Sequence, residues 1–490
     1  MPALTRRQLL ERAAFGVSLS LVAAACAPAA PSPTTAARPS STTATSSAAL
    51  PASVPNPSKP KAEFPARTEQ YEDGYVNYPA NPFKAVPQPP GSGSTVNALT
   101  IGLFPPPTPF DQNPAWQAVN KALNANVQFS IVPQSEYPAK LGVTMAGGDL
   151  PDLIFFWGNA PATAITSSAG LPQFLQSQAA DLTPYLGGDA IKDYPHLAAF
   201  PTFAWRNSGS VYNGRVQMVP KPSYLPGFVF LKNATHWDKD IGKDVQPKNA
   251  DDFRRMLKAL THPQEGRWGI GSDPVDAFGV VYLSAFFGAP NNWRLASDGK
   301  LVKNFETAEF KEAVGFVHDL WSDGVFHPNT AQYTSNVVAR GEFAAGKWAV
   351  WHDAFNVGWS DAWRRARTGP ASFEVHLINP FPAHDGGKPA QFMGSGTLGA
   401  TALKKGSPER VQELLRILNY LAAPFGSQED LLLSFGVEGT DYSLDTRGNP
   451  VLTERGNPDA NYVPWKYVTQ RPPVLYQPDI PEFAQRVSEA

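Results

Sequence analysis

The sequence predicts an α/β protein with mainly parallel sheets, helices on the faces of those sheets, and two lobes. Apolar runs of strand length alternate with amphipathic runs of helix length, which is typical of parallel sheets whose strands are connected by helices. Residues 95–490 are more than a single hydrophobic core normally supports. We therefore expect two cores.

The alternation is clearest at the start of this region. An apolar run is closed by the prolines at 105–107, and a later helix-like run ends at two glycines. The expected order of strand, helix, strand, helix and strand covers residues 99–104, 114–123, 127–132, 136–146 and 153–156. Ligands in such sheets bind beyond the carboxyl ends of the strands, so the residues after 156 are candidates for a site.

Three later segments have the apolar spacing of surface helices, and the third begins with Ser407 and Pro408 in N-cap and first-turn positions. Their apolar stripes are Phe253, Met256, Leu257 and Leu260; Phe310, Val314, Val317 and Trp321; and Val411, Leu414, Leu415 and Leu418. We expect each stripe to face a core.

The N-terminus has the pattern of a lipoprotein export signal. Residues 1–26 combine a twin-arginine start, an apolar stretch shorter than a membrane-spanning helix normally requires, and a small-residue cleavage region. Cys26, the one cysteine of the chain, ends this signal, and we expect it to be acylated. Cleavage without acylation and an uncleaved anchor are open alternatives, because Ala23 stands where the lipoprotein consensus usually has leucine. Export by the general secretory route is also open.

Two further segments precede the folded body. Residues 27–60 consist almost wholly of Ala, Pro, Ser and Thr and lack the apolar side chains that offset the entropy of ordering, so we expect a disordered linker. Residues 61–94 carry aromatic side chains among many prolines. We expect them to lie extended over the body.

Composition and motifs argue against several classes of protein. The net charge of −2 does not indicate a nucleic-acid partner, and a single cysteine provides no disulfide framework and no cysteine metal site. No HExxH and no GxSxG motif is present. Residues 394–399 match GxGxxG, but no convincing helix follows directly, so we expect no nucleotide or other cofactor. Paired carboxylates of a glycosidase remain open, with Asp152 as the candidate acid.

Several segments resemble, in the same order, extracellular solute-binding proteins of family 1, the group that includes maltose-binding protein. Residues 147–155 are similar to its Gly-Asp-x-Pro-Asp-hydrophobic segment, and residues 341–350 to its Phe-x-x-Gly-Lys-x-Ala-hydrophobic strand. Residues 214–233 and 394–402 resemble the two passages between its lobes. The chain departs from the family at 216–220, where Tyr-Gly-hydrophobic-Pro is common.

The resemblance implies a type II periplasmic-binding fold, with two lobes that close on a ligand by rotation about hinge strands. It places lobe 1 at residues 95–222, lobe 2 at 226–392, the return to lobe 1 at 395–430, and the C-terminal helices and tail, 431–490, with lobe 2. The implied hinge residues are Pro222, Gly227, Gly394 and Gly396. The resemblance further implies a monomer that delivers its ligand to ABC permease subunits.

A sugar site needs flat aromatic rings for the C–H faces of the pyranose and polar side chains for its hydroxyls. Candidates stand at predicted strand ends and at the two passages: Trp157, Asn159, Trp205, Tyr224, Trp293, Trp351, Asp353 and Phe392. For each tryptophan the alternative is a place in an aromatic-rich core, and for Trp348 we expect the core.

Together these observations predict an exported, non-enzymatic binding lipoprotein that captures a carbohydrate, most simply an oligosaccharide, for an ABC importer. Acylated Cys26 would anchor it to the outer face of the bacterial cytoplasmic membrane. The alternatives are a secreted carbohydrate-active enzyme and a binding protein for another solute.

Overall fold

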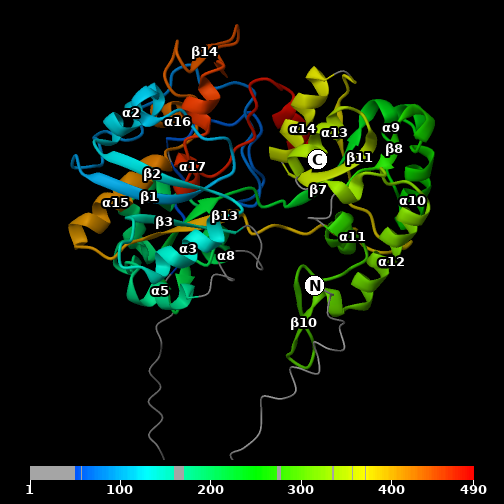
Figure 1. The fold of residues 1–490 in the computed structure, drawn as a ribbon, viewed down its shortest axis with the longest axis horizontal. Coiled ribbons are helices and arrows are strands. Elements are labelled where there is room, and N and C mark those ends of the chain that lie inside the picture. The colour runs from blue at the N-terminus through cyan, green and yellow to red at the C-terminus, as the bar shows by residue number, and fades with distance from the viewer. Residues whose placement is uncertain are drawn as a thin grey trace, which may run out of the picture. The chain divides into compact units, whose positions relative to one another are not determined.

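The computed structural model describes residues 50–56, 58–158, 170–272, 277–333, 336–355, 357–369 and 371–489. These residues belong to one compact unit, and Figure 1 shows its two sheets apart from each other. The expected signal, with Cys26, and residues 27–49 of the expected linker lie outside the described residues. No helix in the described ranges combines the length and the apolar character that a membrane span requires.

The first lobe contains a five-stranded sheet in the order β2-β1-β3-β13-β6. Its strands are β1 (Thr95–Gly102), β2 (Asn126–Pro133), β3 (Leu153–Trp157), β6 (Met218–Pro222) and β13 (Thr397–Leu403). β1 is parallel to both β2 and β3, as the alternating pattern predicted, whereas β13 is antiparallel to β3 and β6. β13 therefore runs against the other four strands.

The second lobe contains a four-stranded sheet in the order β12-β7-β11-β8. Its strands are β7 (Phe228–Asn233), β8 (Trp268–Ile270), β11 (Trp348–Ala354) and β12 (Val375–Ile378). β7 is antiparallel to its neighbours β11 and β12, and β11 is parallel to β8. In each sheet, the one opposed strand is the strand by which the chain arrives from the other lobe.

Helices cover these sheets. In the first lobe they are α2 (Pro114–Leu123), α3 (Tyr137–Ala146), α5 (Leu171–Ser177), α6 (Thr183–Leu186), α7 (Pro195–Ala198), α8 (Thr202–Asn207) and α15 (Pro408–Leu421). In the second they are α9 (Ala234–Asp240), α10 (Ala250–Ala259), α11 (Val280–Phe286), α12 (Ala308–Ser322), α13 (Asn336–Ala344) and α14 (Val357–Thr368). Asn113 and Ser407 cap α2 and α15 by accepting a backbone N–H.

Short elements complete the chain. The hairpins are β4 (Val211–Tyr212) with β5 (Arg215–Val216), β9 (Trp293–Leu295) with β10 (Leu301–Lys303), and β14 (Tyr442–Leu444) with β15 (Pro450–Leu452). The remaining single turns are η1 (Phe110–Gln112), η2 (Gly188–Asp193), η3 (Pro263–Glu265), η4 (Ala277–Gly279), η5 (Asn304–Glu306), η6 (Thr330–Gln332) and η7 (Asn457–Asn461).

Two of the three predicted apolar stripes face a core. The four apolar residues predicted on α15 are buried, and so are those of α10 and Leu260 directly after it. The stripe predicted on α12 is mostly wrong: Val317 packs against the core of the second lobe, but Val314 and Trp321 are nearly half exposed while Ala313 and Leu320 are buried. The helix is rotated because Leu320, which the stripe omitted, packs in the core of the second lobe.

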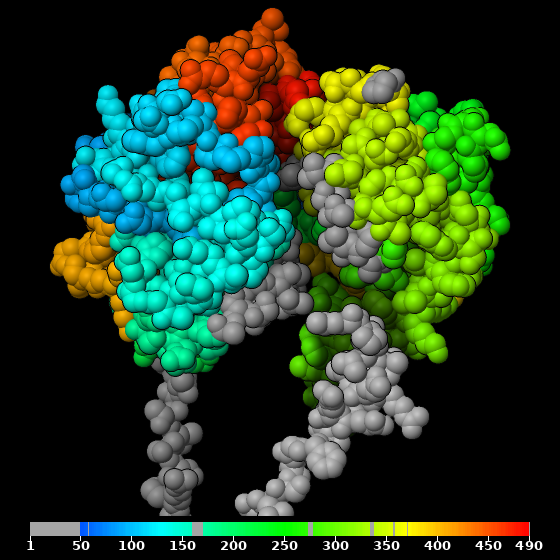
Figure 2. All heavy atoms as spheres, in the orientation of Figure 1, coloured from blue at the N-terminus to red at the C-terminus, as the bar shows by residue number. Residues whose placement is uncertain are grey.

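The C-terminal segment differs from the expectation that residues 431–490 belong to lobe 2. Leu433 of α16 (Gln428–Phe435) and Trp465 and Val468 of α17 (Trp465–Val468) lie in the core of lobe 1. Leu475 and α18 (Phe483–Glu489) instead pack in lobe 2. Figure 2 shows these residues, in orange and red, beside both lobes. The tail thus crosses between the lobes a third time, where Gln470 donates to Pro222 O at 2.7 Å.

Residues 61–94 contain little regular structure and lie on the folded body. Tyr75 and Tyr78 are buried against Phe425, with ring centroids 4.5 and 5.0 Å away. Farther along, Glu429 accepts the backbone N–H groups of residues 85 and 86, and Glu413 accepts that of Ser92. Aromatic burial and buried carboxylates therefore fix this segment.

Candidate ligand-binding site

The first two crossings between the lobes are hydrogen-bonded to each other. Ser223 N donates to Gly396 O at 2.9 Å, Gly394 N donates to Leu225 O at 2.7 Å, and Pro226 pairs with Met393. Both crossings therefore form one narrow antiparallel ribbon. The four predicted hinge residues lie in this ribbon or at its end, where Pro222 pairs with Thr397.

Gly396 is required at its position for two reasons. Its φ of +70° lies in the left-handed region, and a Cβ there would overlap the Phe203 ring. Gly394 is also tightly placed, because a Cβ would lie 3.2 Å from Leu225 O. The small residues that the sequence analysis assigned to flexibility thus also permit close packing of the two crossings.

On lobe 1, three strands place three residues in a row at the end of the sheet. Gly399 of β13 pairs with Trp157 of β3 on one side and with Lys221 of β6 on the other. Directly paired residues of antiparallel strands point to the same face. That face is the one covered by α17, because Thr401, two residues along β13, donates its hydroxyl to Val468 O.

Trp157 and Lys221, which provide the side chains of this row, each carry a hydrogen-bond donor and lie among aromatic rings. The Lys221 ammonium lies 5.7 Å from the centroid of the Tyr467 ring, and the Tyr467 ring lies 6.1 Å from that of Phe155. Lys221 is only 6% exposed. Within the described part of the chain, the enclosed indole nitrogen of Trp157 has no hydrogen-bond partner.

Lys466 acts electrostatically on Lys221, and Arg471 and Asp430 in turn act on Lys466. Arg471 pairs with Asp430, whose Oδ1 is 2.6 Å from Nε, and Asp430 also accepts the Tyr78 hydroxyl. Burial, together with the neighbouring Lys466, lowers the pKa of Lys221 to about 7. Burial likewise lowers the pKa of Lys466 to about 8. The protein thus holds two lysines where their charged forms are disfavoured.

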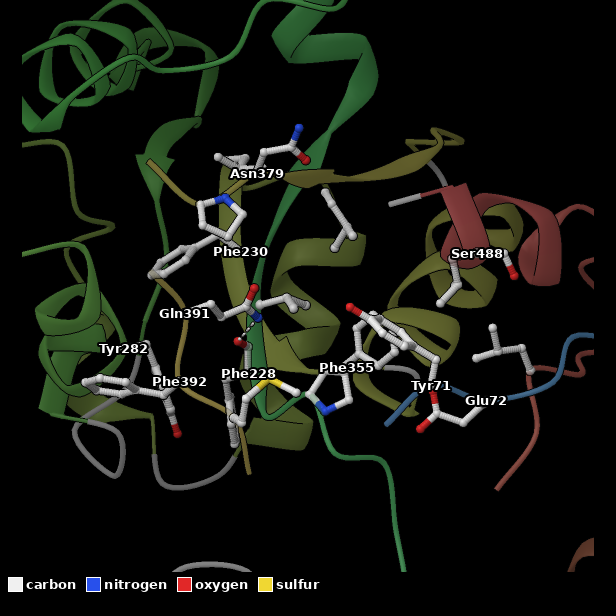
Figure 3. A pocket seen from close by; sticks show the side chains of 18 of the residues that line it. Tyr71, Glu72, Phe228, Phe230, Tyr282, Phe355, Asn379, Gln391, Phe392 and Ser488 are labelled. Atoms are coloured by element: carbon white, nitrogen blue, oxygen red, sulfur yellow. Dashed lines mark hydrogen bonds between the residues drawn. The ribbon is translucent and has the colours of Figure 1, made fainter. Parts of the chain in front are cut away.

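On lobe 2, a cavity of about 250 Å³ adjoins the second crossing (Figure 3). The Phe228 and Tyr282 rings in its wall are stacked, with centroids 4.3 Å apart and an interplanar angle of 14°. Phe392 also lines it, and Gln391 Nε2 donates to Phe228 O at 3.0 Å. Flat apolar faces and amide groups therefore meet here.

Glu72 lines the same cavity from the N-terminal segment. Burial raises the pKa of this carboxyl group to about 7, although the Leu225 N–H in the first crossing favours its charged form. An acid thus touches the hinge ribbon and loses its proton near neutral pH. Around the cavity and the row, the described residues contain no group of three side chains arranged to hold a metal ion.

Comparison with known proteins identifies the family. The model for bacterial extracellular solute-binding proteins matches residues 115–432, which include most of both lobes. The chain belongs to this family.

Two curated relatives come from Bacillus subtilis (strain 168). The solute-binding protein is 26% identical to lipoprotein LipO over 382 residues, which cover 72% of this chain and 68% of LipO. It is 24% identical to the polygalacturonan/rhamnogalacturonan-binding protein YtcQ over 67% of this chain and 63% of YtcQ. The alignment thus spans less than two-thirds of YtcQ.

Among solved structures, the solute-binding protein is similar to the S. pneumoniae ABC-transporter substrate-binding protein FusA in complex with kestose. The TM-score is 0.55 and the identity 15%, over 81% of this chain and 83% of FusA. This similarity, with the two sheets and their exchanged strands, shows the predicted two-lobed type II fold.

Three of the predicted site residues are in the core instead. Trp205 is fully buried in lobe 1. Trp351 is fully buried and stacks between Trp348 and His352. Asp353 is 1% exposed and satisfied by Arg340, whose Nε donates at 2.7 Å. The strand-end argument failed here because β11 is central in its sheet and helices cover both its faces.

The other predicted residues differ in their surroundings. Phe392 and Trp157 lie at the surfaces described above, whereas Tyr224 donates its hydroxyl to Val474 O at 3.0 Å. Trp293 is half exposed on the β9–β10 hairpin, with the Lys303 ammonium 4.9 Å from its ring centroid. Asn159 lies outside the described residues.

Sequence reasoning missed Lys221, Lys466, Glu72 and Tyr282. One signal was available for Lys221, which stands between Pro220 and Pro222 in an otherwise apolar strand. A lone lysine in a buried strand needs a partner or a function. No local pattern marks the other three, because their importance comes from segments distant in sequence.

We predict that Trp351→Ala lowers the free energy of unfolding by about 3–5 kcal/mol, since it leaves a large cavity in the core. Urea unfolding monitored by circular dichroism measures this loss. The matched control is Trp321→Ala, which removes a half-exposed ring and should change stability little. If Trp351→Ala left stability unchanged and weakened ligand binding, Trp351 would be a ligand-binding residue and the prediction would be wrong.

We predict that Glu72→Gln changes how stability depends on pH. The raised pKa means that the folded state retains a proton which the unfolded state loses above about pH 4.5. As pH rises from about 4.5 towards about 7, the Glu72 carboxyl group ionises in the unfolded state but not in the folded state, so the wild type loses stability. Glutamine does not ionise, so the variant does not lose this stability. Thermal melts from pH 5 to 8 should show the variant gaining about 1–2 kcal/mol relative to wild type. If wild type and Glu72→Gln showed the same dependence of stability on pH, the raised pKa of Glu72 would be contradicted.

Proposed function

We propose that this protein is the substrate-binding component of an ABC importer and that its ligand is a carbohydrate, an oligosaccharide in particular. The observation that carries the proposal is the placement of flat aromatic faces beside the hinge ribbon. Trp157 ends β3 of lobe 1, and the Phe228–Tyr282 stack begins β7 of lobe 2. Aromatic faces of this kind bind the apolar C–H faces of sugar rings.

The relatives support the same class of ligand. YtcQ is by name a binder of polygalacturonan and rhamnogalacturonan, and FusA was solved with kestose. Family membership supports capture of a solute outside the cell for a membrane permease. Closure would rotate the lobes about the paired parts of the crossings, residues 223–226 and 393–396, which are few residues long.

The protein acts without catalysing a reaction in this proposal. Asp152, the candidate acid of a glycosidase, pairs with Arg410, with Oδ1 and a guanidinium nitrogen 2.9 Å apart, and its other oxygen accepts the Asn97 N–H. A carboxylate fixed by these partners holds the start of β3 against β1 and α15. The contacts of Asp152 with the described residues are therefore those of a structural side chain.

The first test is incubation of the purified protein with a panel of oligosaccharides, including fragments of galacturonan and maltodextrins. A bound sugar at 100 times its dissociation constant adds about 2.7 kcal/mol of stability, which appears as a rise in the melting temperature. We expect such a rise with no new reducing ends. Release of reducing ends would indicate the secreted enzyme, and stabilisation by amino acids or peptides alone would indicate another solute.

We further propose that Cys26 is acylated and anchors the protein to the outer face of the cytoplasmic membrane. Cys26→Ser should move the protein from the membrane fraction to the soluble exported fraction without changing its melting temperature. The matched control is Ser40→Ala in the adjoining linker, which should remain membrane-bound. Membrane association of Cys26→Ser equal to that of the wild type would contradict the anchor.

A further inference from the structure

We propose that the row at the end of the lobe 1 sheet is a carboxylate subsite, in which Lys221 and Lys466 bind the acid group of a uronate-bearing oligosaccharide. This inference deepens the proposed function and rests on it. Nothing in the neutral-sugar chemistry considered above requires two lysines at such a place.

Lys221 lies at the end of the lobe 1 sheet without an ion-pair partner among the described residues. Its strand register places it beside Gly399 and on the same face as Trp157, at the end of the sheet next to the hinge ribbon. The side chain is more than nine-tenths buried, and no carboxylate or hydrogen-bond acceptor contacts its ammonium among the described residues. The contact that the structure shows is the Tyr467 ring, 5.7 Å away.

Other charged side chains lie near Lys221. Lys466, on α17, lies close enough to act on it electrostatically, and this neighbour is also a cation. Asp430 acts electrostatically on Lys466 and is bound to Arg471 at 2.6 Å. Neither Lys221 nor Lys466 has an ion-pair partner in the described ranges, whereas Arg471 does. An anion that entered beside Lys221 and Lys466 would relieve a repulsion built into the fold.

The aromatic residues of the row indicate what kind of acid would bind. Trp157, on the same face of the sheet as Lys221, has an enclosed indole N–H that lacks a partner in the described ranges. Because Gly399 has no side chain, the fully buried Phe155 ring lies over it, and the partly buried Tyr467 ring packs against Phe155. A pyranose with a carboxylate on the ring matches this set, since it offers an apolar face and two charged oxygens.

The test compares a trigalacturonate with its fully methyl-esterified form, in calorimetric titrations of mature protein purified in detergent. We expect the wild type to bind the acid at least tenfold more tightly than the ester. Lys221→Met, which keeps the aliphatic stem, should abolish this preference, and Lys466→Met should reduce it. The matched control Lys121→Met removes an exposed lysine of α2 and should preserve it.

The wild type alone gives a second measurement, in case a lysine variant does not fold. An anion binds the charged form of Lys221, so affinity for the acid should fall as pH rises above the free pKa of about 7. Lys466 and Tyr467 on α17, with Arg471 and Asp430, are the other titratable groups here. Affinity for the ester should stay constant from pH 6 to 8.

Two results would overturn the inference. If acid and ester bind equally, or if Lys221→Met weakens both by the same factor, the row does not recognise charge, while the proposed function stands. If neither form binds and the neutral oligosaccharides also fail to stabilise the protein, the proposed function itself fails.

Discussion

The antiparallel pairing of the first two crossings is the constraint on which the rest of the structure depends. Because both crossings are hydrogen-bonded to each other, β7 must enter lobe 2 and β13 must re-enter lobe 1 against the direction of their neighbours. That reversal brings Gly399 between Trp157 and Lys221. The glycines matching a nucleotide motif in the sequence thus serve hinge packing and strand exchange.

A second constraint is the unequal distribution of charge around the hinge. Glu72 and Lys221 are each held where the charged form is disfavoured, and both lie beside segments that must move if the lobes rotate. A protein that only needed stability would pair such groups or replace them by apolar ones. Retaining lysines without counter-ions is consistent with a ligand that provides the missing charge.

The pattern-based part of the fold was largely predictable. The strands and helices between residues 95 and 157 follow from apolar periodicity and caps, and the first helix has the predicted limits. The stripe on α12 was wrong because Phe310, Val314 and Trp321 satisfy helical spacing without facing the core. Periodicity gives a helix its amphipathic spacing, but packing neighbours decide which face is buried.

By itself, the sequence determined the α/β class, the order of the elements, and the likeness to a binding-protein family. These features depend on local spacing and on residue type. Only the tertiary structure decided that Trp205 and Trp351 lie in cores while Trp157 lies at a strand end, and that the tail crosses back between lobes. Burial and charge environment are set by residues hundreds of positions away, as Lys221 and Lys466 show, and no local pattern records them.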